Sequence, residues 1–487
     1  MALMSALSLR ARGVRRAAVA IGSLAACACV AAPVHPQAAA VVRPLAYTRM
    51  VLPNGLVALI NEDHSAPVVA IDVWYHIGAK NETTGHTGLA HLCEHLMGEG
   101  SPNLHEPEKV FIQSVGGTSL HFSYTTEDVT HYYATFPSNQ LEPMLWMESD
   151  RMAAPLSMAD SAHVASVREV IRQERLQDRE TRAFDAARPA NAALLFGAQS
   201  PYAIDPLGPM NDLATATAAE ARQFCLPYYV PNNAVIALSG DLSTNTARAL
   251  VTKYFGPIAR GAAVTHGPVP VAHRTVPVRA VYEDPRARAP ELWLTWLGAA
   301  SAASDRVALN ALGAMLSRDR VGYLSRLLVE DRHLATRVLA DNFDDERAGL
   351  FQIIVYPRGN ASLTQIEDVV DSALTTFKAQ RVTVADLATF QRSNAVTAIK
   401  WLQLREQRAD TLAHDEMFAH DPTAYAKQVD EAFALTPADI QRVARKYLTP
   451  GHVVLSLVPA GKTEMAAHPE RPATNVTPEF AKAAPRP

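Results

Sequence analysis

The chain repeats part of its own pattern in its second half. One copy reads TAAEARQFCLPYYVPNNAVIAL (217–238) and the other reads TPADIQRVARKYLTPGHVVLSL (436–457). The matching positions hold an acid, a tyrosine and a proline at one constant offset in numbering: Glu220 with Asp439, Tyr228 with Tyr447, and Pro231 with Pro450. Each copy predicts a helix that ends at a Y-x-x-P turn and is followed by a strand of apolar and β-branched residues.

A second pair of segments has nearly the same offset. The stretch LAHLCEHL (89–96) matches LNALGAML (309–316), and an apolar, strand-like run precedes each. Chance would not make two independent stretches agree to within a single position. A chain of 487 residues is also too long for one compact core. We therefore predict two copies of one domain.

The first copy carries three polar residues that the second copy lacks. They are His91, Glu94 and His95, which align with Ala311, Ala314 and Met315. A helix that accepts small and apolar residues at these places does not need polar ones, and buried polar groups cost free energy unless they are paired. The three residues are therefore candidates for a functional site.

Their spacing suits zinc. Residues i and i+4 lie on one face of an α-helix, so the imidazoles of His91 and His95 can bind one cation. Neutral imidazole binds zinc at ~2.0–2.1 Å. Glu94 lies about 100° around the helix from His95, where it can accept a proton from metal-activated water. The competing interpretation is an ordinary helix with incidental histidines.

A third ligand must come from another segment, because catalytic zinc usually has three protein ligands. The helical pattern SVREVIRQERLQDRE (166–180) offers Glu169, Glu174 and Glu180. Spacing alone does not choose among these three glutamates.

Several segments carry a family resemblance. They are LPNGLVALINEDHSAPVVAIDVWYHIGAKNE, GGTSLHFSYTTEDVTHYYATF, SPYAIDPLG and YYVPNNAVIALSGDLS, in this order, together with the inverted motif H-x-x-E-H. Over about residues 45–460 the chain resembles the pitrilysin or insulinase-type (M16) zinc metallopeptidases, including mitochondrial processing peptidase and smaller bacterial two-subunit members. The resemblance implies an α+β fold of two homologous domains, each a mostly antiparallel sheet flanked by helices, forming half of a bowl-like chamber.

The resemblance also assigns roles. It implies that His91 and His95 bind one zinc ion, that Glu94 is the catalytic base, and that Glu174, in the segment VIRQER, is the third metal ligand. The other two glutamates of that helix are then expected to be solvated charges. The implied activity is that of a zinc-dependent endopeptidase that hydrolyses unstructured peptides.

The chain departs from the family pattern at a substrate-binding strand. Relatives commonly have an asparagine and a small residue shortly after the double glycine, whereas this chain has Leu120-His121. We expect His121 to be structural or to line a rim rather than to bind metal. Substrate binding by strand addition stays open, because it uses main-chain hydrogen bonds.

A second departure lies in the second copy. Many relatives carry an arginine and a tyrosine seven residues apart, which help to hold the substrate, but Val329 and Thr336 stand here. The resemblance to two-subunit members predicts a heterodimer with a homologous, metal-free subunit that supplies the missing pair. The alternative is that Arg326 or Tyr323 replaces it through a shift of register.

The first forty residues predict a secretory signal. Arginines precede the apolar run AAVAIGSLAACACVAA, and the small residues PQAAA follow it. We expect an exported, periplasmic protein. The stretch LAAC also resembles a lipobox, which would make Cys27 a lipid anchor, and cleavage after Ala40 is the alternative. The pair Arg15-Arg16 is only weak evidence for twin-arginine export.

Composition limits the remaining choices. With 48% hydrophobic residues, 19% charged residues and a net charge of -4, the chain has a globular composition and implies no nucleic-acid partner. Beyond the leader only Cys93 and Cys225 remain, too few for a disulfide framework. Cys93 is expected to fill an apolar slot.

We place the first, zinc-bearing domain at 45–260 and the second, without a metal site, at 281–462. The intervening segment 261–280, rich in proline and small residues, is predicted to be a linker, and 463–487 a disordered tail. Two other functions stay open. One is a binding or scaffold subunit of the same fold, and the other is a zinc hydrolase of a non-peptide amide or ester.

Overall fold

The computed structural model describes residues 42–477 except 120–121, 266, 268, 270 and 380–381. The predicted leader, with Cys27, and the residue His121 lie outside the described residues. Within the described part, no helix is both long enough and apolar enough to cross a membrane.

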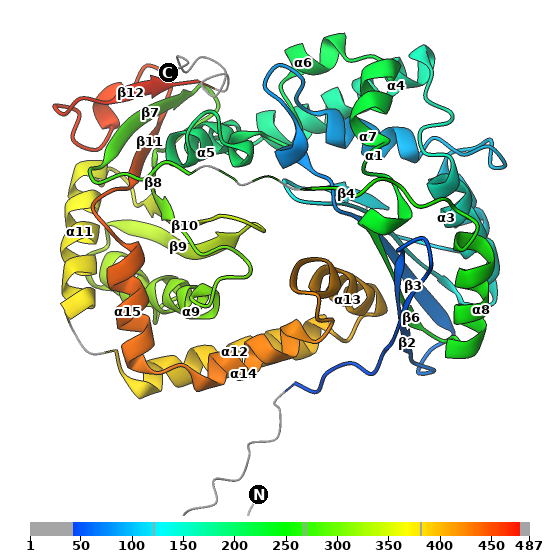
Figure 1. The fold of residues 1–487 in the computed structure, drawn as a ribbon. Coiled ribbons are helices and arrows are strands. Elements are labelled where there is room, and N and C mark those ends of the chain that lie inside the picture. Colours follow the sequence, from blue (N-terminus) through cyan, green and yellow to red (C-terminus); the bar gives the residue numbers. More distant parts are fainter. Residues whose placement is uncertain are drawn as a thin grey trace, which may run out of the picture. The chain divides into compact units, whose positions relative to one another are not determined.

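The first half of the described chain contains a six-stranded sheet, sheet 1 (Figure 1). In spatial order its strands are β1 (Thr48–Val51), β2 (Val57–Glu62), β6 (Ala234–Gly240), β3 (Val68–Tyr75), β5 (Thr130–Pro137) and β4 (Ser123–Thr125). Neighbouring strands are antiparallel except for β2 and β6, which are parallel.

The second half contains another six-stranded sheet, sheet 2, of related topology. Its strands in spatial order are β12 (Thr474–Val476), β7 (Val278–Asp284), β11 (Val453–Pro459), β8 (Glu291–Leu297), β10 (Gly349–Pro357) and β9 (Ala335–Asp344). Neighbouring strands are antiparallel except that β7 is parallel to both β11 and β12. The predicted pair of mostly antiparallel α+β halves is therefore confirmed.

The duplicated segments form the same elements in both halves. Helix α7 (Ala218–Cys225) leads to β6, and helix α15 (Pro437–Tyr447) leads to β11. Both helices begin with a capping box, Thr217 with Glu220 and Thr436 with Asp439, at corresponding positions of the repeat. The side chain of each cap accepts a backbone N–H that the first helical turn leaves without a partner.

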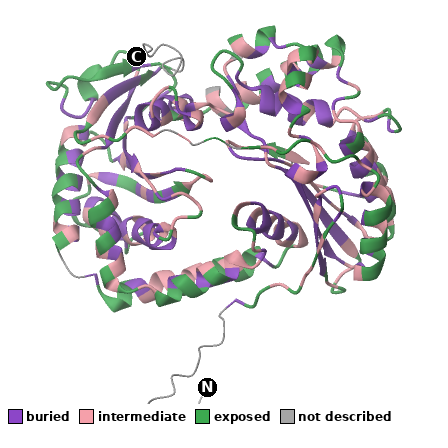
Figure 2. Cartoon of the chain, in the orientation of Figure 1, coloured by how far each residue is buried: buried purple, intermediate pink, exposed green. Residues whose placement is uncertain are grey.

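A layer of helices buries one face of each sheet. In the first half the layer contains α1 (Leu89–Met97), α2 (Glu108–Ser114), α3 (Leu141–Ala153), α4 (Ser161–Arg175), α6 (Met210–Thr215), α7 and α8 (Thr244–Phe255). In the second half it contains α9 (Arg306–Ser317), α10 (Tyr323–Ser325), α11 (Leu363–Ala379) and α15, beside α12 (Val384–Trp401) and α14 (Ala424–Ala434). Figure 2 shows how these layers turn their buried residues toward the strands.

The other face of each sheet is covered by a helix from the opposite half. Helix α13 (Arg405–Ala419) packs on β3 and β6 of sheet 1 through Ala409, Leu412 and Ala413 (Figure 1). Helix α5 (Arg188–Phe196) packs on β8 and β11 of sheet 2. The two helices occupy corresponding positions of the repeat, so each half lends the same element to the other. The division of the sequence into two domains on either side of 261–280 did not predict that each domain contributes a helix to the sheet of the other.

The end of the chain corrects another expectation. The predicted disordered tail is wrong over residues 463–476, where a short helical turn (Thr463–Met465) and strand β12 follow β11. Strand β12 adds to the edge of β7 by backbone pairing and buries Val476. Backbone pairing needs no apolar pattern, so a search for such patterns could not find this strand. The described residues between Phe255 and Val278 form neither helix nor strand.

Candidate metal centre

Helix α1 is capped by a carboxylate from outside the helix. Its N-cap, Gly88, has a positive φ of 86° and offers no side chain. The Glu82 carboxylate instead accepts hydrogen bonds from the N–H groups of Gly88 (2.7 Å) and Ala90 (2.7 Å). Burial raises the pKa of Glu82 to about 8, and these two bonds act against that rise. A Cβ on Gly208 would lie 2.6 Å from the Cα of Gly88, so two glycines are needed at this contact.

A disulfide fixes the same helix to its neighbour. Cys93 of α1 bonds to Cys225 at the end of α7, with 6.5 Å between their Cα atoms. The expectation that Cys93 only fills an apolar slot is therefore wrong, because one buried pair needs no larger framework. The repeat contained a signal for this pairing, because both cysteines align with residues on two helices that contact each other in the second half. The counterparts of the two cysteines are Gly313 and Ala444, which are small residues on the contacting helices α9 and α15.

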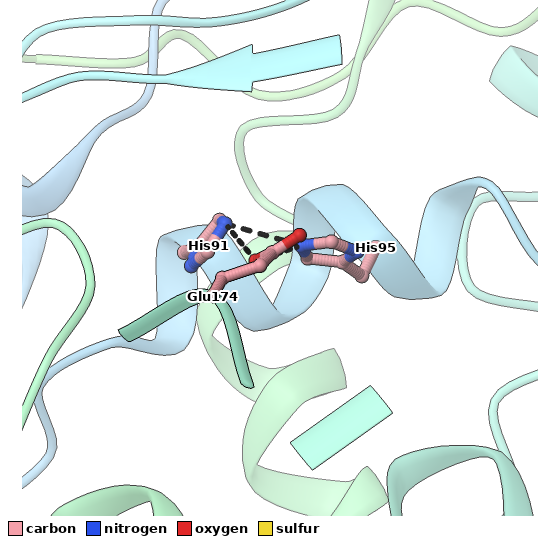
Figure 3. Close-up of side chains that lie close together, drawn as sticks. All are labelled: His91, His95 and Glu174. Atoms are coloured by element: carbon pink, nitrogen blue, oxygen red, sulfur yellow. Dashed lines mark hydrogen bonds and ion pairs between the residues drawn. The ribbon is translucent and has the colours of Figure 1, made fainter. Parts of the chain in front are cut away.

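Three of the residues singled out in the sequence come together. The Nε2 atom of His95 lies 3.1 Å from Nε2 of His91 and 3.2 Å from Oε2 of Glu174. The distance from Nε2 of His91 to the same carboxylate oxygen is 3.5 Å. Figure 3 shows the imidazoles projecting from α1 toward Glu174, which approaches from another segment. Glu174 is near the end of α4, which contacts α1.

This arrangement fits a tetrahedral metal ion. Ligand atoms bound at ~2.0–2.1 Å in tetrahedral geometry are separated by about 3.3 Å, close to the three observed distances of 3.1, 3.2 and 3.5 Å. Two imidazole nitrogens and a carboxylate oxygen this close repel one another unless a proton or a cation lies between them. The donor set, two histidines and one glutamate, is one that catalytic zinc uses.

The electrostatic setting differs between the two imidazoles. Burial lowers the pKa of His91, which favours the neutral form that binds metals. Burial also acts to lower the pKa of His95, but the hydrogen bond to Glu174 and the charge of Glu94 outweigh it, so that pKa is raised. The Glu174 carboxylate thus stabilises positive charge at the centre of the cluster.

Glu94 lies beside the three converging atoms rather than among them. Its Oε2 is 4.0 Å from Nε2 of His91, and the residue is only 4% exposed. The hydroxyl of Thr125, on strand β4, donates a hydrogen bond to the same oxygen. Sequence reasoning missed Thr125, because its contact with α1 arises only when β4 lies next to that helix.

The remaining candidates lie apart from this cluster. Glu169 is exposed and pairs with Arg172 at 2.7 Å, as expected for a solvated charge. The structure does not describe the side chain of Glu180. Tyr323 packs against Phe377 in the core of the second half.

Two models of one peptidase family match the chain. The model described as "Insulinase (Peptidase family M16)" matches residues 57–192, and the model described as "Peptidase M16 inactive domain" matches residues 215–394. The first range contains the candidate metal centre, and the second contains α9, where small and apolar residues replace the motif.

Curated relatives include named zinc proteases. The chain is 24% identical over 405 residues to the zinc protease PqqE of Helicobacter pylori, covering 81% of this chain and 89% of that protein. It is 30% identical over 212 residues to the probable zinc protease PqqL of Escherichia coli, covering 41% and 22% respectively. A probable mitochondrial-processing peptidase subunit beta of Arabidopsis thaliana is 23% identical over 431 residues, covering 84% and 77%.

Solved structures share the fold. A protease from Helicobacter pylori superposes with a TM-score of 0.76 at 23% identity, over 86% of this chain and all of that one. A peptidase M16 inactive domain from Pseudomonas fluorescens gives 0.75 at 18% identity, over 85% and 99%. The first half of the periplasmic protease PqqL from Escherichia coli gives 0.71 at 17% identity, over 90% and 95%.

Proposed function

Because the chain belongs to the insulinase (M16) peptidase family, we propose that it is a zinc-dependent endopeptidase that hydrolyses unstructured peptides. The observation that carries the proposal is the convergence of His91, His95 and Glu174 within 3.5 Å, with the Glu94 carboxylate beside them. These three residues would hold the zinc ion, and Glu94 would be the catalytic base. The relatives named as zinc proteases support the choice of metal.

The chemistry divides between the ion and the side chains. Zinc, when bound, supplies Lewis acidity that lowers the pKa of water toward neutrality and polarises a carbonyl group. Glu94 accepts the proton of the attacking water and delivers it to the leaving amine. Thr125 donates a hydrogen bond to Oε2 of Glu94, the oxygen that lies 4.0 Å from Nε2 of His91, and so fixes the orientation of the carboxylate beside the three ligand atoms. Burial of Glu94 excludes competing water from this transfer.

Thr125 is therefore expected to position the base. Thr125→Val keeps the shape of the side chain but removes the hydroxyl, which lets the Glu94 carboxylate rotate. We expect kcat to fall by ~10-fold while KM changes little, because general acid–base catalysis is sensitive to the placement of the base. Thr125→Ser keeps the donor and should retain most of the activity. Steady-state kinetics on one peptide will separate the two variants, and equal kcat values would remove Thr125 from this role.

The sheet edge offers a place for an extended substrate. Strand β4 is at the edge of sheet 1, next to β5, and carries Thr125. A peptide added along β4 would form main-chain hydrogen bonds with little dependence on its sequence. Its scissile bond would then lie close to Glu94, which Thr125 contacts.

A homologous partner subunit is part of the proposal. The positions of the family's arginine and tyrosine are taken by Val329 and Thr336. In the structure the Thr336 hydroxyl donates to the backbone oxygen of Tyr356 at 3.2 Å, a bond within sheet 2. Hydrogen-bond donors for the developing oxyanion would then come from a metal-free chain of the same fold. Each such donor contributes a factor of ~10²–10³ to the rate.

Export is supported by two observations. The Cys93–Cys225 disulfide suits an oxidising compartment, where such bonds persist. The Escherichia coli protein of similar fold is described as periplasmic. We infer that the chain acts in the periplasm after removal of its leader. If the leader is cleaved before Cys27, a lipid on Cys27 would anchor the exported chain to a membrane.

The test is hydrolysis of a panel of unstructured peptides by the purified chain, alone and with the subunit that co-purifies from the native host. We expect cleavage that is lost on chelation and restored by zinc, and that is faster with the partner. Absence of cleavage in both preparations, with zinc bound, would favour the scaffold subunit, an alternative to which the likeness to an M16 inactive domain draws attention. Cleavage of amide or ester substrates but not of peptides would favour the non-peptide hydrolase.

A further inference from the structure

A second cluster of ligand-type side chains lies where α13 covers sheet 1. It contains Asp72 of β3, His131 of β5 and Asp410 of α13, each with one ligand-type atom within 4.8 Å of the others. Among the described residues, this cluster and the group His91, His95 and Glu174 are the two sets that could hold a metal ion. The cluster faces away from α1, since neighbouring Ala70 and Trp74 of β3 belong to the α13 side of the sheet.

Asp72 is a buried carboxylate with one oxygen unused. The residue is 1% exposed, and its Oδ1 lies 3.1 Å from Nδ1 of His131. Its Oδ2 is buried without a hydrogen-bond partner. Burying a carboxylate oxygen without a donor is costly, and proteins retain such atoms where they have a ligand or another role.

His131 is held in place by aromatic rings. It stacks on Tyr133 at 5.0 Å between ring centroids, with 22° between the planes, and lies 4.8 Å from the ring of Trp74. This packing fixes the imidazole next to Asp72, so that two of the three ligand atoms are preorganised. The separation of 3.1 Å between them matches the spacing of ligands around one ion.

Carboxylates outnumber imidazoles in and around the cluster. The groups that act on the Asp410 carboxyl are two further carboxylates, Asp72 and Glu406, and two imidazoles, His131 and His414. Acids therefore outnumber histidines around this contact. Burial and the charge of Asp72 raise the pKa of Asp410 to about 7. A cation at this place would stabilise the two carboxylates of Asp72 and Asp410 in their charged forms.

The second half contains a neutral version of the same contact. Asn191 of α5 occupies the position of the repeat that corresponds to Asp410, and it covers sheet 2 as Asp410 covers sheet 1. There the Thr295 hydroxyl donates to Oδ1 of Asn191 (3.1 Å) and Nε2 of Gln352 donates to the Thr295 hydroxyl (3.2 Å). The fold therefore needs only neutral polar groups at this helix–sheet contact. Packing alone does not require the two acids and the histidine of the first half.

We propose that Asp72, His131 and Asp410 bind a second divalent transition-metal ion, distinct from the one at His91, His95 and Glu174. One imidazole nitrogen with two carboxylate oxygens suits zinc or manganese better than calcium, which prefers oxygen ligands alone. The Asp410 oxygen lies within 4.8 Å of the other two ligand atoms, so a small movement of its side chain would complete the ligand set. The ion joins α13 of the second half to β3 and β5 of the first, so it stabilises the exchanged helix.

The test counts metal on the full chain. After chelation, the protein is dialysed against micromolar Zn²⁺ and the bound zinc is measured for the parent and for Asp410→Asn. The variant copies Asn191 of the second half and is therefore expected to fold. We expect two ions in the parent, one in Asp410→Asn, and two in the matched control Glu406→Gln, which removes a carboxylate from the same helix outside the ligand set. Asp72→Asn is a second variant and should also bind one.

A variant that lacks the proposed catalytic zinc site distinguishes this proposal from the proposed function. His91→Ala should bind one ion, and Zn²⁺ should raise its melting temperature, whereas His91→Ala/Asp410→Asn should bind none and show no rise. One ion in the parent, lost in His91→Ala and kept in Asp410→Asn, would overturn the second site and leave the proposed function intact. The reverse pattern would support this site and remove the metal from the proposed catalytic centre.

Discussion

Glu94→Gln should slow peptide hydrolysis severely while zinc stays bound. Glutamine has nearly the same shape as glutamate but cannot accept the proton of water, so binding and folding persist without the base. General base catalysis contributes roughly 10²–10⁴ in rate, and we expect kcat to fall by ~10³-fold. Glu94 is not one of the three proposed zinc ligands, so its replacement leaves His91, His95 and Glu174 in place.

The measurement pairs zinc content with kcat on one unstructured peptide. Glu169→Gln is the matched control, because Glu169 lies on the same helix as Glu174 but pairs with Arg172 at the surface. It should have the zinc content and kcat of the parent. If Glu94→Gln cleaved the peptide at the parent rate, another group would have to be the base.

Loss of the Cys93–Cys225 disulfide should destabilise the fold by about 3–5 kcal/mol, because the bond closes a long loop in the unfolded chain. The cysteines have a sequence separation of 132, and the bond joins α1 to α7. Both side chains are fully buried, so Cys93→Ala/Cys225→Ala also loses some packing. Since α1 carries two of the proposed zinc ligands, we further expect weaker zinc retention during dialysis against a chelator.

Thermal unfolding of the parent and the double variant, each with and without reductant, isolates the bond itself. Reductant should lower the melting temperature of the parent and leave that of the double variant unchanged. Equal melting temperatures for the oxidised parent and the variant would show that packing of α1 against α7 suffices without the covalent link.

The parts of the fold that could be predicted from the sequence depend on local pattern. The Y-x-x-P turns and the alternation of apolar residues place α7 before β6 and α15 before β11, and the duplication made each copy a check on the other. Likewise, His91, Glu94 and His95 are within one helical turn, so their relation could be worked out from helix geometry alone. Glu174 needed the family resemblance, because three glutamates of one helix look equivalent in sequence.

The parts that escaped prediction depend on contacts between distant segments. Helices α5 and α13 each bury a face in the structure, but their sequences do not say which sheet that face covers. The same limit hid Thr125 beside Glu94 and Asp410 beside Asp72, since each pair meets only after two elements pack. The short strand β12 escaped for another reason, as edge pairing rests on the backbone rather than on side-chain pattern.

The exchange of α5 and α13 has a consequence for how such a chain arose. A single ancestral copy of this unit would have left one side of its sheet bare, because the helix that covers it belongs to the other copy. Such a copy would have needed a twin, with each molecule inserting its helix into its neighbour. The present chain has the form of that swapped pair joined end to end, with the segment between Phe255 and Val278 connecting the two copies.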